Sequence, residues 1–252
     1  MTFAVPAEAY GRFMGRFSEP LGAVFADACG VRAGQRVLDV GCGPGALTVE
    51  LVRRLGPDAV TAIDPSPPFV EAAAARFPRV DVRTGAAEDL PFADATFDAA
   101  LAQLVVHFMA DPVQGLREMG RVTRPGGTVG ACVWDHGGRQ GPLSVFWAAV
   151  RDLAPDAPGE AELAGTHEGQ LVERARAAGL TTAQPGTVSV TVSFPTFDDW
   201  WEPFTLGVGP AGAYVAGLDP DQRTALRSRC AELLPAALFD LTVSAWSVTA
   251  RV

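Results

Sequence analysis

The chain has 252 residues, of which 48% are hydrophobic and 19% charged, and its formal net charge at pH 7 is −9. This composition is typical of one large globular domain, or of one domain with an insertion, that buries a sizeable core. The acidic balance argues against a nucleic acid and against an anionic membrane surface as partners, because both need a basic face.

Residues 36–135 alternate between the patterns of strand and helix. Nearly continuous apolar runs predict five strands, at 36–42, 59–64, 80–85, 97–106 and 127–134. Helical segments are predicted between them at 45–56, 67–77 and 111–122, and we expect Arg124–Gly127 to form the turn that closes the last one. Apolar strands that alternate with helices indicate a parallel sheet covered on both faces, and right-handed crossovers make such a sheet doubly wound.

The pattern changes after residue 134. The expected elements are two helices and two antiparallel strands, at 141–155, 168–180, 187–194 and 239–252. The roughly 45 residues between these last two strands are too many for a hairpin turn, so we interpret 196–236 as an inserted helical cap over the edge of the sheet. The predicted fold is therefore an α/β, doubly wound, seven-stranded, mostly parallel sheet with a helical cap between its last two strands.

A glycine-rich turn follows the first predicted strand, in "RVLDVGCGPGALT" at Arg36–Thr48. Dinucleotide-binding turns prefer the spacing G-x-G-x-x-G, in which the start of the helix meets a pyrophosphate. Here the glycines are Gly41, Gly43 and Gly45, so the third comes one residue early. Asp39, two positions before the first glycine, is a further departure, which makes an NAD-dependent dehydrogenase the weakest interpretation.

The motif "VLDVGCGPGALT" resembles the first motif of class I S-adenosylmethionine (SAM)-dependent methyltransferases. The later segments "AIDPS", "GAAEDLPFADATFD" and "EMGRVTRPGG" match, in order and spacing, the small-molecule branch of methyltransferase type 11, which includes ubiquinone and menaquinone methyltransferases. The resemblance covers about residues 36–134 and implies a Rossmann-like methyltransferase fold. Together with the predicted elements, it gives four expected parts: an N-terminal helical segment over the cofactor site (1–35), a SAM-binding core (36–135), the rest of the core (136–195 with 237–252) and the cap (196–236).

The resemblance also implies where SAM, and its product S-adenosylhomocysteine, would bind. Glycines 41 and 43 would let the main chain lie against the methionine portion, where a Cβ would clash. Asp39 would order this loop and the amino-acid end, and Asp64 would accept hydrogen bonds from both ribose hydroxyls. Ala86 stands where relatives often carry Asp or Asn toward adenine, so a polar contact there would come from Glu88, from Asp89, from water or from nothing. The full set of candidate cofactor-binding residues is Tyr10, Asp39, Gly41, Gly43, Gly45, Asp64, Pro65, Ala86, Ala87, Glu88 and Gln103.

Methyl transfer to oxygen or carbon usually also needs a proton to be removed, most often by His. His107 and His136 follow the fourth and fifth predicted strands, at the edge where doubly wound sheets bind ligands. They are the candidate bases, with Asp135 as a weaker candidate, although a lone His near a pocket is more often a packing or hydrogen-bonding residue. We expect His167 to be structural. No cluster of metal ligands is evident, so we expect no metal.

Six aromatic residues follow the fifth predicted strand or lie in the insertion: Trp134, Phe146, Trp147, Trp200, Trp201 and Phe204. They suggest a small apolar or aromatic acceptor, although they could equally form the core of the cap. Alternative functions are an enzyme such as a cyclase that uses SAM without methyl transfer, and a non-catalytic SAM-binding protein. The N-terminus does not resemble a secretory signal and the four cysteines lie far apart, so we expect a cytoplasmic monomer or homodimer without disulfides.

Overall fold

The computed structural model describes residues 7–157, 159–235 and 237–252, so the first six residues of the expected N-terminal segment lie outside the described residues. It contains one seven-stranded sheet with the strand order β3-β2-β1-β4-β5-β7-β6. Strands β1 to β5 are parallel, and β7 runs antiparallel to both of its neighbours. The strands are β1 Val37–Val40, β2 Val60–Asp64, β3 Asp81–Thr84, β4 Phe97–Gln103, β5 Thr123–Trp134, β6 Gln184–Phe194 and β7 Phe239–Arg251.

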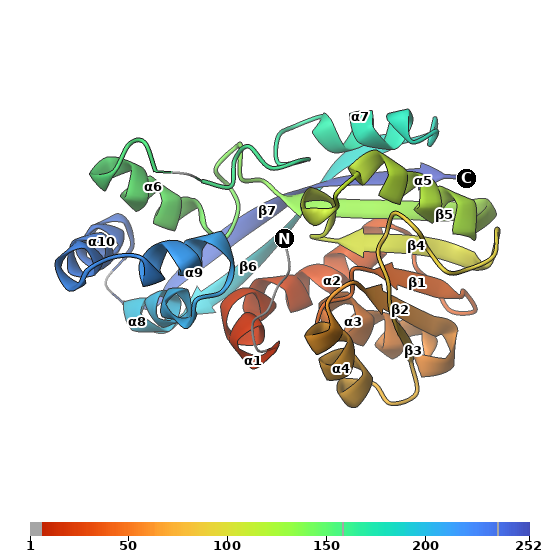
Figure 1. Ribbon diagram of the computed structural model, residues 1–252, viewed down its shortest axis with the longest axis horizontal. Coiled ribbons are helices and arrows are strands. Elements are labelled where there is room, and N and C mark those ends of the chain that lie inside the picture. Colours follow the sequence, from red (N-terminus) through yellow and green to blue (C-terminus); the bar gives the residue numbers. More distant parts are fainter. Residues whose placement is uncertain (1–6, 158, 236) are drawn as a thin grey trace.

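Helices cover both faces of this sheet (Figure 1). Two separate apolar clusters result, one that includes Leu21 and Leu51 and another that includes Leu116 and Leu171. The α-helices are α1 Ala7–Tyr10, α2 Arg16–Ala28, α3 Ala46–Leu55, α4 Pro67–Arg76, α5 Pro112–Val122, α6 Ser144–Leu153, α7 Gln170–Ala177, α8 Phe197–Trp201, α9 Gly209–Ala216 and α10 Pro220–Leu233. A doubly wound, mostly parallel, seven-stranded sheet was the predicted fold, and the structure confirms it.

The N-terminal helices form one continuous helical stretch, in which the π-helix η1, Gly11–Gly15, joins α1 to α2. Helix α2 buries Phe17, Leu21 and Phe25, which recur at helical spacing along one face. It packs against α3 and β6. The apolar face of α2 therefore fixes the N-terminal segment against the sheet, next to the carboxyl ends of the parallel strands.

The segment between β6 and β7 contains α8, the 3₁₀-helix η4 (Glu202–Leu206), α9 and α10. Figure 1 shows these helices gathered with α6 at one end of the molecule, away from β1 to β3. Phe146 of α6 stacks on Phe204 of η4 with ring centroids 4.6 Å apart, and Phe204 also meets Phe13 of η1 at 5.2 Å. Aromatic packing thus connects the insertion to α6 and to the N-terminal stretch.

Arg124–Gly127 do not form a turn between helix and strand, as predicted, but lie within strand β5. Helix α5 leads directly into β5 at Thr123, and the four residues bulge out of the strand between the pairs Phe97↔Thr123 and Ala99↔Thr128. Val252 stabilises the bulge: its carbonyl accepts from the Gly126 amide at 2.7 Å, and its amide donates to the Gly127 carbonyl at 3.1 Å. Gly126 has φ +79°, which suits glycine.

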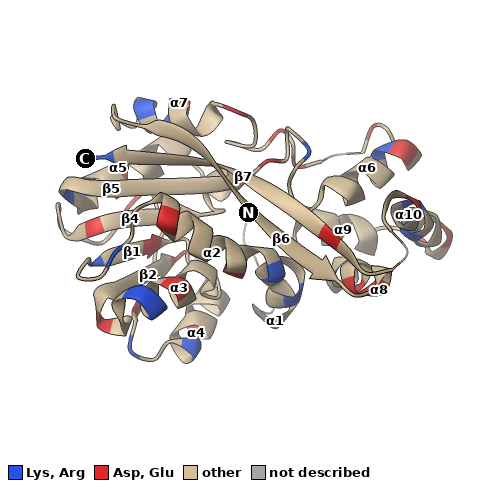
Figure 2. Cartoon of the chain, turned by 180° about the vertical axis from the view of Figure 1, so that it is seen from behind, with Lys and Arg blue, Asp and Glu red and all other residues tan. Residues whose placement is uncertain are grey.

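Charged side chains lie mainly on the helices and loops. In the view of Figure 2, basic and acidic positions are interspersed and the long strands β5, β6 and β7 are mostly uncharged. Within the described ranges, no helix is both long and apolar enough to cross a membrane.

Candidate active site

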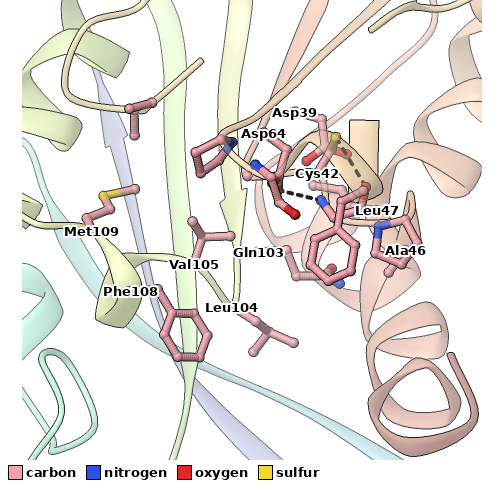
Figure 3. A pocket seen from close by; sticks show the side chains of 18 of the residues that line it. Asp39, Cys42, Ala46, Leu47, Asp64, Gln103, Leu104, Val105, Phe108 and Met109 are labelled. Carbon is pink, nitrogen blue, oxygen red and sulfur yellow. Dashed lines mark hydrogen bonds between the residues drawn. The ribbon is translucent and has the colours of Figure 1, made fainter. Parts of the chain in front are cut away.

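A cavity of about 340 Å³ lies at the carboxyl ends of β1, β2 and β4. Its walls include Gly41, which follows β1. Asp64 and Gln103, the last residues of β2 and β4, also line it (Figure 3). The chain runs from β1 to β2 on one side and later returns to β4 on the other, so the strand order reverses at this point. Doubly wound sheets bind ligands at such a switch point.

Asp64 is the best-defined acceptor in this cavity. Its Oδ2 accepts from the Gly43 amide at 2.8 Å and its Oδ1 from the Ser66 amide at 2.8 Å, and the residue is only 6% exposed. Burial raises the pKa of this carboxyl group, and the two amide hydrogen bonds act in the opposite direction. A carboxylate offers about four lone-pair sites, so each oxygen retains one for a further donor.

Asp39 lies deeper, on β1. Its Oδ2 accepts from the hydroxyl of Thr48 at 2.6 Å, which ties the strand to the first turn of α3. Burial, and secondarily the nearby charge of Asp64, raise the pKa of Asp39 to about 7. Asp39 thus helps to order the glycine turn through its bond to α3, and its side chain also lines the cavity.

The three glycines of the turn have three different surroundings, although all have positive φ. A Cβ added to Gly41 would lie 2.4 Å from the side chain of Val105, and one added to Gly45 would lie 2.4 Å from the ring of Phe77. A Cβ added to Gly43 would meet no described atom within 4 Å, and Gly43 lines the cavity. Packing within the protein thus already favours glycine at position 41, although Gly41 also lines the cavity. Of the three glycines, Gly43 is the one with open space beside its main chain.

The amide of Gln103 joins β4 to helix α2. Its Nε2 donates to the carbonyl of Ser18 at 2.8 Å, whereas its Oε1 and the Ser18 hydroxyl find no hydrogen-bond partner among the described residues. Both side chains line the cavity and are at least nine-tenths buried. The sequence analysis missed Ser18. A polar residue among the apolar positions Phe17 and Leu21 on the buried face of a helix was the available signal.

Four further predicted residues, Pro65, Ala86, Ala87 and Glu88, form another part of the wall. Glu88 already uses Oε1, which accepts from the Ala110 amide at 2.7 Å and the Asp111 amide at 3.2 Å at the start of α5.

Tyr10 also lines the cavity, with its ring 5.4 Å from that of Phe69. Burial, together with the charge of Asp64, raises the pKa of Tyr10 to about 12. The structure thus brings ten of the eleven predicted cofactor-binding residues to one cavity. Gly45 is the exception, since it packs against Phe77 instead.

A second, smaller cavity of about 40 Å³ adjoins the first, and Tyr10, Leu104 and Phe108 line both. Both predicted histidines, His107 and His136, line this second cavity, with ring centroids 6.4 Å apart. The Nδ1 atom of each ring finds no hydrogen-bond partner within the described part of the chain.

Burial determines the protonation of these histidines. It lowers the pKa of His107 to about 3, with a further contribution from His136, and it lowers the pKa of His136 to about 4. Both rings are therefore neutral at pH 7. Asp135 accepts from the Gly138 amide at 2.5 Å and is 2% exposed, which gives it a role in the turn after β5.

Glu160 also lines the second cavity, and it was not predicted from the sequence. It belongs to the loop between α6 and α7, is 6% exposed, and its Oε2 accepts from the indole Nε1 of Trp147 at 2.9 Å. Burial raises its pKa. The Pro- and Gly-rich surroundings of Glu160 carry no periodicity from which burial could be inferred.

Most of the six aromatic residues that could contact an acceptor pack against one another instead. Trp134 lines the second cavity. Trp200 and Trp201 pack on Phe204 with ring centroids 4.8 Å and 6.0 Å away, and Phe146 stacks on the same ring. Most of the set therefore forms the core between the insertion and α6.

Part of the chain is similar to a known protein family. Residues 38–130 match the family model described as a methyltransferase domain. A demethylmenaquinone methyltransferase of Mycolicibacterium paratuberculosis is 44% identical over 123 residues, which cover 49% of this chain and 50% of that protein. The chain spans about half, or less, of the length of the curated relatives that it matches.

Solved structures share the fold at low sequence identity. Phosphoethanolamine N-methyltransferase 2 of Haemonchus contortus, in complex with phosphomonomethylethanolamine and S-adenosylhomocysteine, is 18% identical, covers 98% of this chain and 56% of its own, and has a TM-score of 0.59. A [4+2]-cyclase is 20% identical, with coverage of 92% and 81% and a TM-score of 0.57.

Proposed function

We propose that this chain, whose residues 38–130 match the model of a methyltransferase domain, is a SAM-dependent methyltransferase that acts on a small molecule. The observation that carries the proposal is the cavity at the switch point of the sheet, where Asp64 faces the open main chain of Gly43. It is supported by the relatives of the matching segment, one of which is a demethylmenaquinone methyltransferase.

The residues of the first cavity fit SAM in shape and in polarity. The two remaining lone-pair sites of Asp64 match the two hydroxyls of a ribose, and the space beside Gly43 admits a ligand against the main chain. The unpartnered Ser18 hydroxyl and Gln103 Oε1 supply one donor and one acceptor, as a carboxylate and an ammonium require.

The charges of this cavity agree with the same ligand. Its lining contains Asp39, Asp64 and Glu88, and none of its described residues is Lys or Arg. SAM carries an ammonium, a sulfonium and one carboxylate, so its net charge is positive. Opposite charges in a partly desolvated site attract more strongly than in water.

When bound, SAM would supply an electrophilic methyl group on its sulfonium. We place the acceptor in the second cavity, because Tyr10, Leu104 and Phe108 form a wall common to both cavities. The protein's main contribution would be to hold the accepting atom in line, about 3–3.5 Å from the methyl carbon.

His107 and His136 would orient the acceptor in our proposal. Each neutral ring offers an unpartnered Nδ1 that can accept a hydrogen bond from a hydroxyl or amine of the substrate. Because burial holds the pKa of His107 at about 3, storing a proton there is unfavourable. The environment therefore supports orientation by His107 more strongly than general-base catalysis, which is most effective with a pKa near the working pH.

A second candidate is an enzyme that binds SAM without transferring its methyl group, and the shared fold with a [4+2]-cyclase favours it over a non-catalytic binder. To separate these functions, the protein is incubated with methyl-labelled SAM and an extract of its native cells. Methyl transfer yields a labelled product, identified by mass spectrometry, together with S-adenosylhomocysteine. The control is the His107→Asn variant. Because His107 lines the second cavity and not the first, this variant should still bind SAM. Label that remains entirely in SAM across such extracts would contradict methyl transfer, and failure of SAM to bind in calorimetry would contradict the whole proposal.

A further inference from the structure

Glu160 is a buried acid that has no basic side chain as a partner among the described residues. Among the described residues, the indole of Trp147 supplies its one side-chain hydrogen bond, at 2.9 Å. No Lys or Arg lies in the described lining of the second cavity. Burying a carboxyl group with a single uncharged partner is costly, and a fold that keeps such a group commonly uses it.

Two other polar side chains of the cavity share one property with Glu160, and its lining also includes Tyr10 and Trp134. His107 and His136 both present an Nδ1 without a hydrogen-bond partner among the described residues, and burial keeps both rings neutral at pH 7. A ligand in this cavity can therefore meet three acceptors, namely one carboxyl group and, in the tautomer that carries its proton on Nε2, each of two imidazoles. The remaining lining is largely apolar, with Phe13, Met14, Leu143 and Val208 among it.

We propose that Glu160 selects the acceptor substrate, and that this substrate is an apolar molecule with a hydroxyl or amine hydrogen-bond donor and no negative charge. The placement of the acceptor in this cavity rests on the proposed function. A carboxylate or phosphate on the substrate would face Glu160 across a poorly solvated space without a compensating cation.

The Trp147 hydrogen bond makes Glu160→Gln an unusually informative variant. Indole Nε1 is a donor only, so in the variant it takes the amide oxygen and leaves the amide NH₂ for the cavity. The substitution therefore replaces an acceptor by a donor at the cavity wall while the bond to Trp147 persists. A purely structural role for Glu160, which is to anchor Trp147, would survive this change.

The experiment measures binding of four naphthalene probes to protein loaded with S-adenosylhomocysteine: 1-naphthol, 1-methoxynaphthalene, 1-(aminomethyl)naphthalene and 1-naphthoate. Wild-type protein should bind the naphthol at least about ten-fold more tightly than its methoxy analogue, because the analogue leaves a buried acceptor without a donor. It should not bind the naphthoate. The naphthol and the aminomethyl probe separate a neutral donor from a cationic one.

Glu160→Gln should abolish or reverse the preference for the naphthol over the methoxy probe, with an unchanged melting temperature. Glu162→Gln is the matched control, because Glu162 lies in the same loop, is exposed and lines neither cavity. Equal binding of naphthol and methoxynaphthalene by the wild type, an unchanged preference in Glu160→Gln, or no binding of any probe would each overturn the proposal.

Failure of the proposed function gives a different result. If calorimetry detects no binding of S-adenosylhomocysteine, the cofactor assignment fails. The same probe series on ligand-free protein then still reports whether Glu160 discriminates donors from acceptors.

Discussion

Ser18→Ala tests the assignment of the first cavity most directly. The Ser18 hydroxyl has no hydrogen-bond partner among the described residues and is 1% exposed, so its removal breaks no described hydrogen bond of the fold. If this hydroxyl donates to the carboxylate of the cofactor, the bond contributes about 1.5–3 kcal/mol, as hydrogen bonds to charged groups do. Affinity for S-adenosylhomocysteine should then fall about ten- to a hundred-fold.

The assay compares two ligands by titration calorimetry. Methylthioadenosine lacks the amino-acid end, so its affinity should be the same in Ser18→Ala as in the wild type. The melting temperature should stay constant or rise, because an unsatisfied buried hydroxyl is lost. Ser228→Ala on the exposed face of α10 is the control. Equal weakening of both ligands, or no weakening of either, would refute the assignment of Ser18 to the amino-acid end.

Three further predictions follow from the same contacts. Asp64→Asn keeps the size of the side chain but loses the charge and one acceptor, because NH₂ replaces one carboxylate oxygen and then faces the Gly43 or the Ser66 amide; calorimetry should show at least about a ten-fold loss of affinity for SAM, and unchanged affinity would remove Asp64 from the ribose site. Gly43→Ala should weaken SAM binding with a small loss of stability, whereas Gly45→Ala should mainly lower the melting temperature, because its Cβ would meet Phe77 at 2.4 Å; the reverse pattern would contradict the assignment of Gly43 to the ligand. His107 stays neutral in the folded protein down to a pKa of about 3, well below its ordinary 6.5, so below pH 6.5 the unfolded state alone takes up a proton and stability falls with pH. Urea titrations at pH 6, 5 and 4 give the free energy of unfolding, whose loss on acidification should be smaller in His107→Asn by about 1.4 kcal/mol per pH unit. The same pH dependence of this free energy in variant and wild type would be inconsistent with a buried neutral ring.

The fold was largely predictable because its signals are local. The alternation of apolar strands and amphipathic helices from residue 36 onward depends on neighbours a few positions apart, and the observed sheet follows it. The bulge at Arg124–Gly127 was not predictable in the same way. Its partner is Val252, at the far end of the chain, and no local pattern reveals that the last residue supplies those hydrogen bonds.

Within the site, residues attached to a strand end or a motif were the ones that could be found. Asp64 ends β2 and belongs to a recognisable segment, so its position beside the glycine turn followed from both. Ser18 and Glu160 are defined by burial alone, and burial of a polar residue depends on distant packing. Glu160 in particular reaches its cavity from an irregular loop, where neither spacing nor composition indicates the direction of a side chain.

The glycine turn shows why a motif identifies a family better than it identifies contacts. Gly41 and Gly45 are required by Val105 and Phe77, residues of this same protein, so they would be needed even without a ligand. Of the three, Gly43 has no such packing neighbour, and Asp64 accepts a hydrogen bond from its amide. Internal packing therefore accounts for two of the three glycines, and our proposal assigns ligand binding to the Gly43 peptide group and the Asp64 carboxylate.

The two cavities share an acidic lining. The first is lined by Asp39, Asp64 and Glu88 and the second by Glu160, and neither has Lys or Arg in its described lining. If SAM binds as proposed, such a site stabilises the cofactor, with its net positive charge, more than it stabilises the neutral product that remains once the sulfonium charge is lost. The same field would oppose an anionic acceptor beside the methyl group. In our proposal, release of the product and rejection of anionic substrates therefore have one common cause, the absence of Lys and Arg from the described linings of the two cavities.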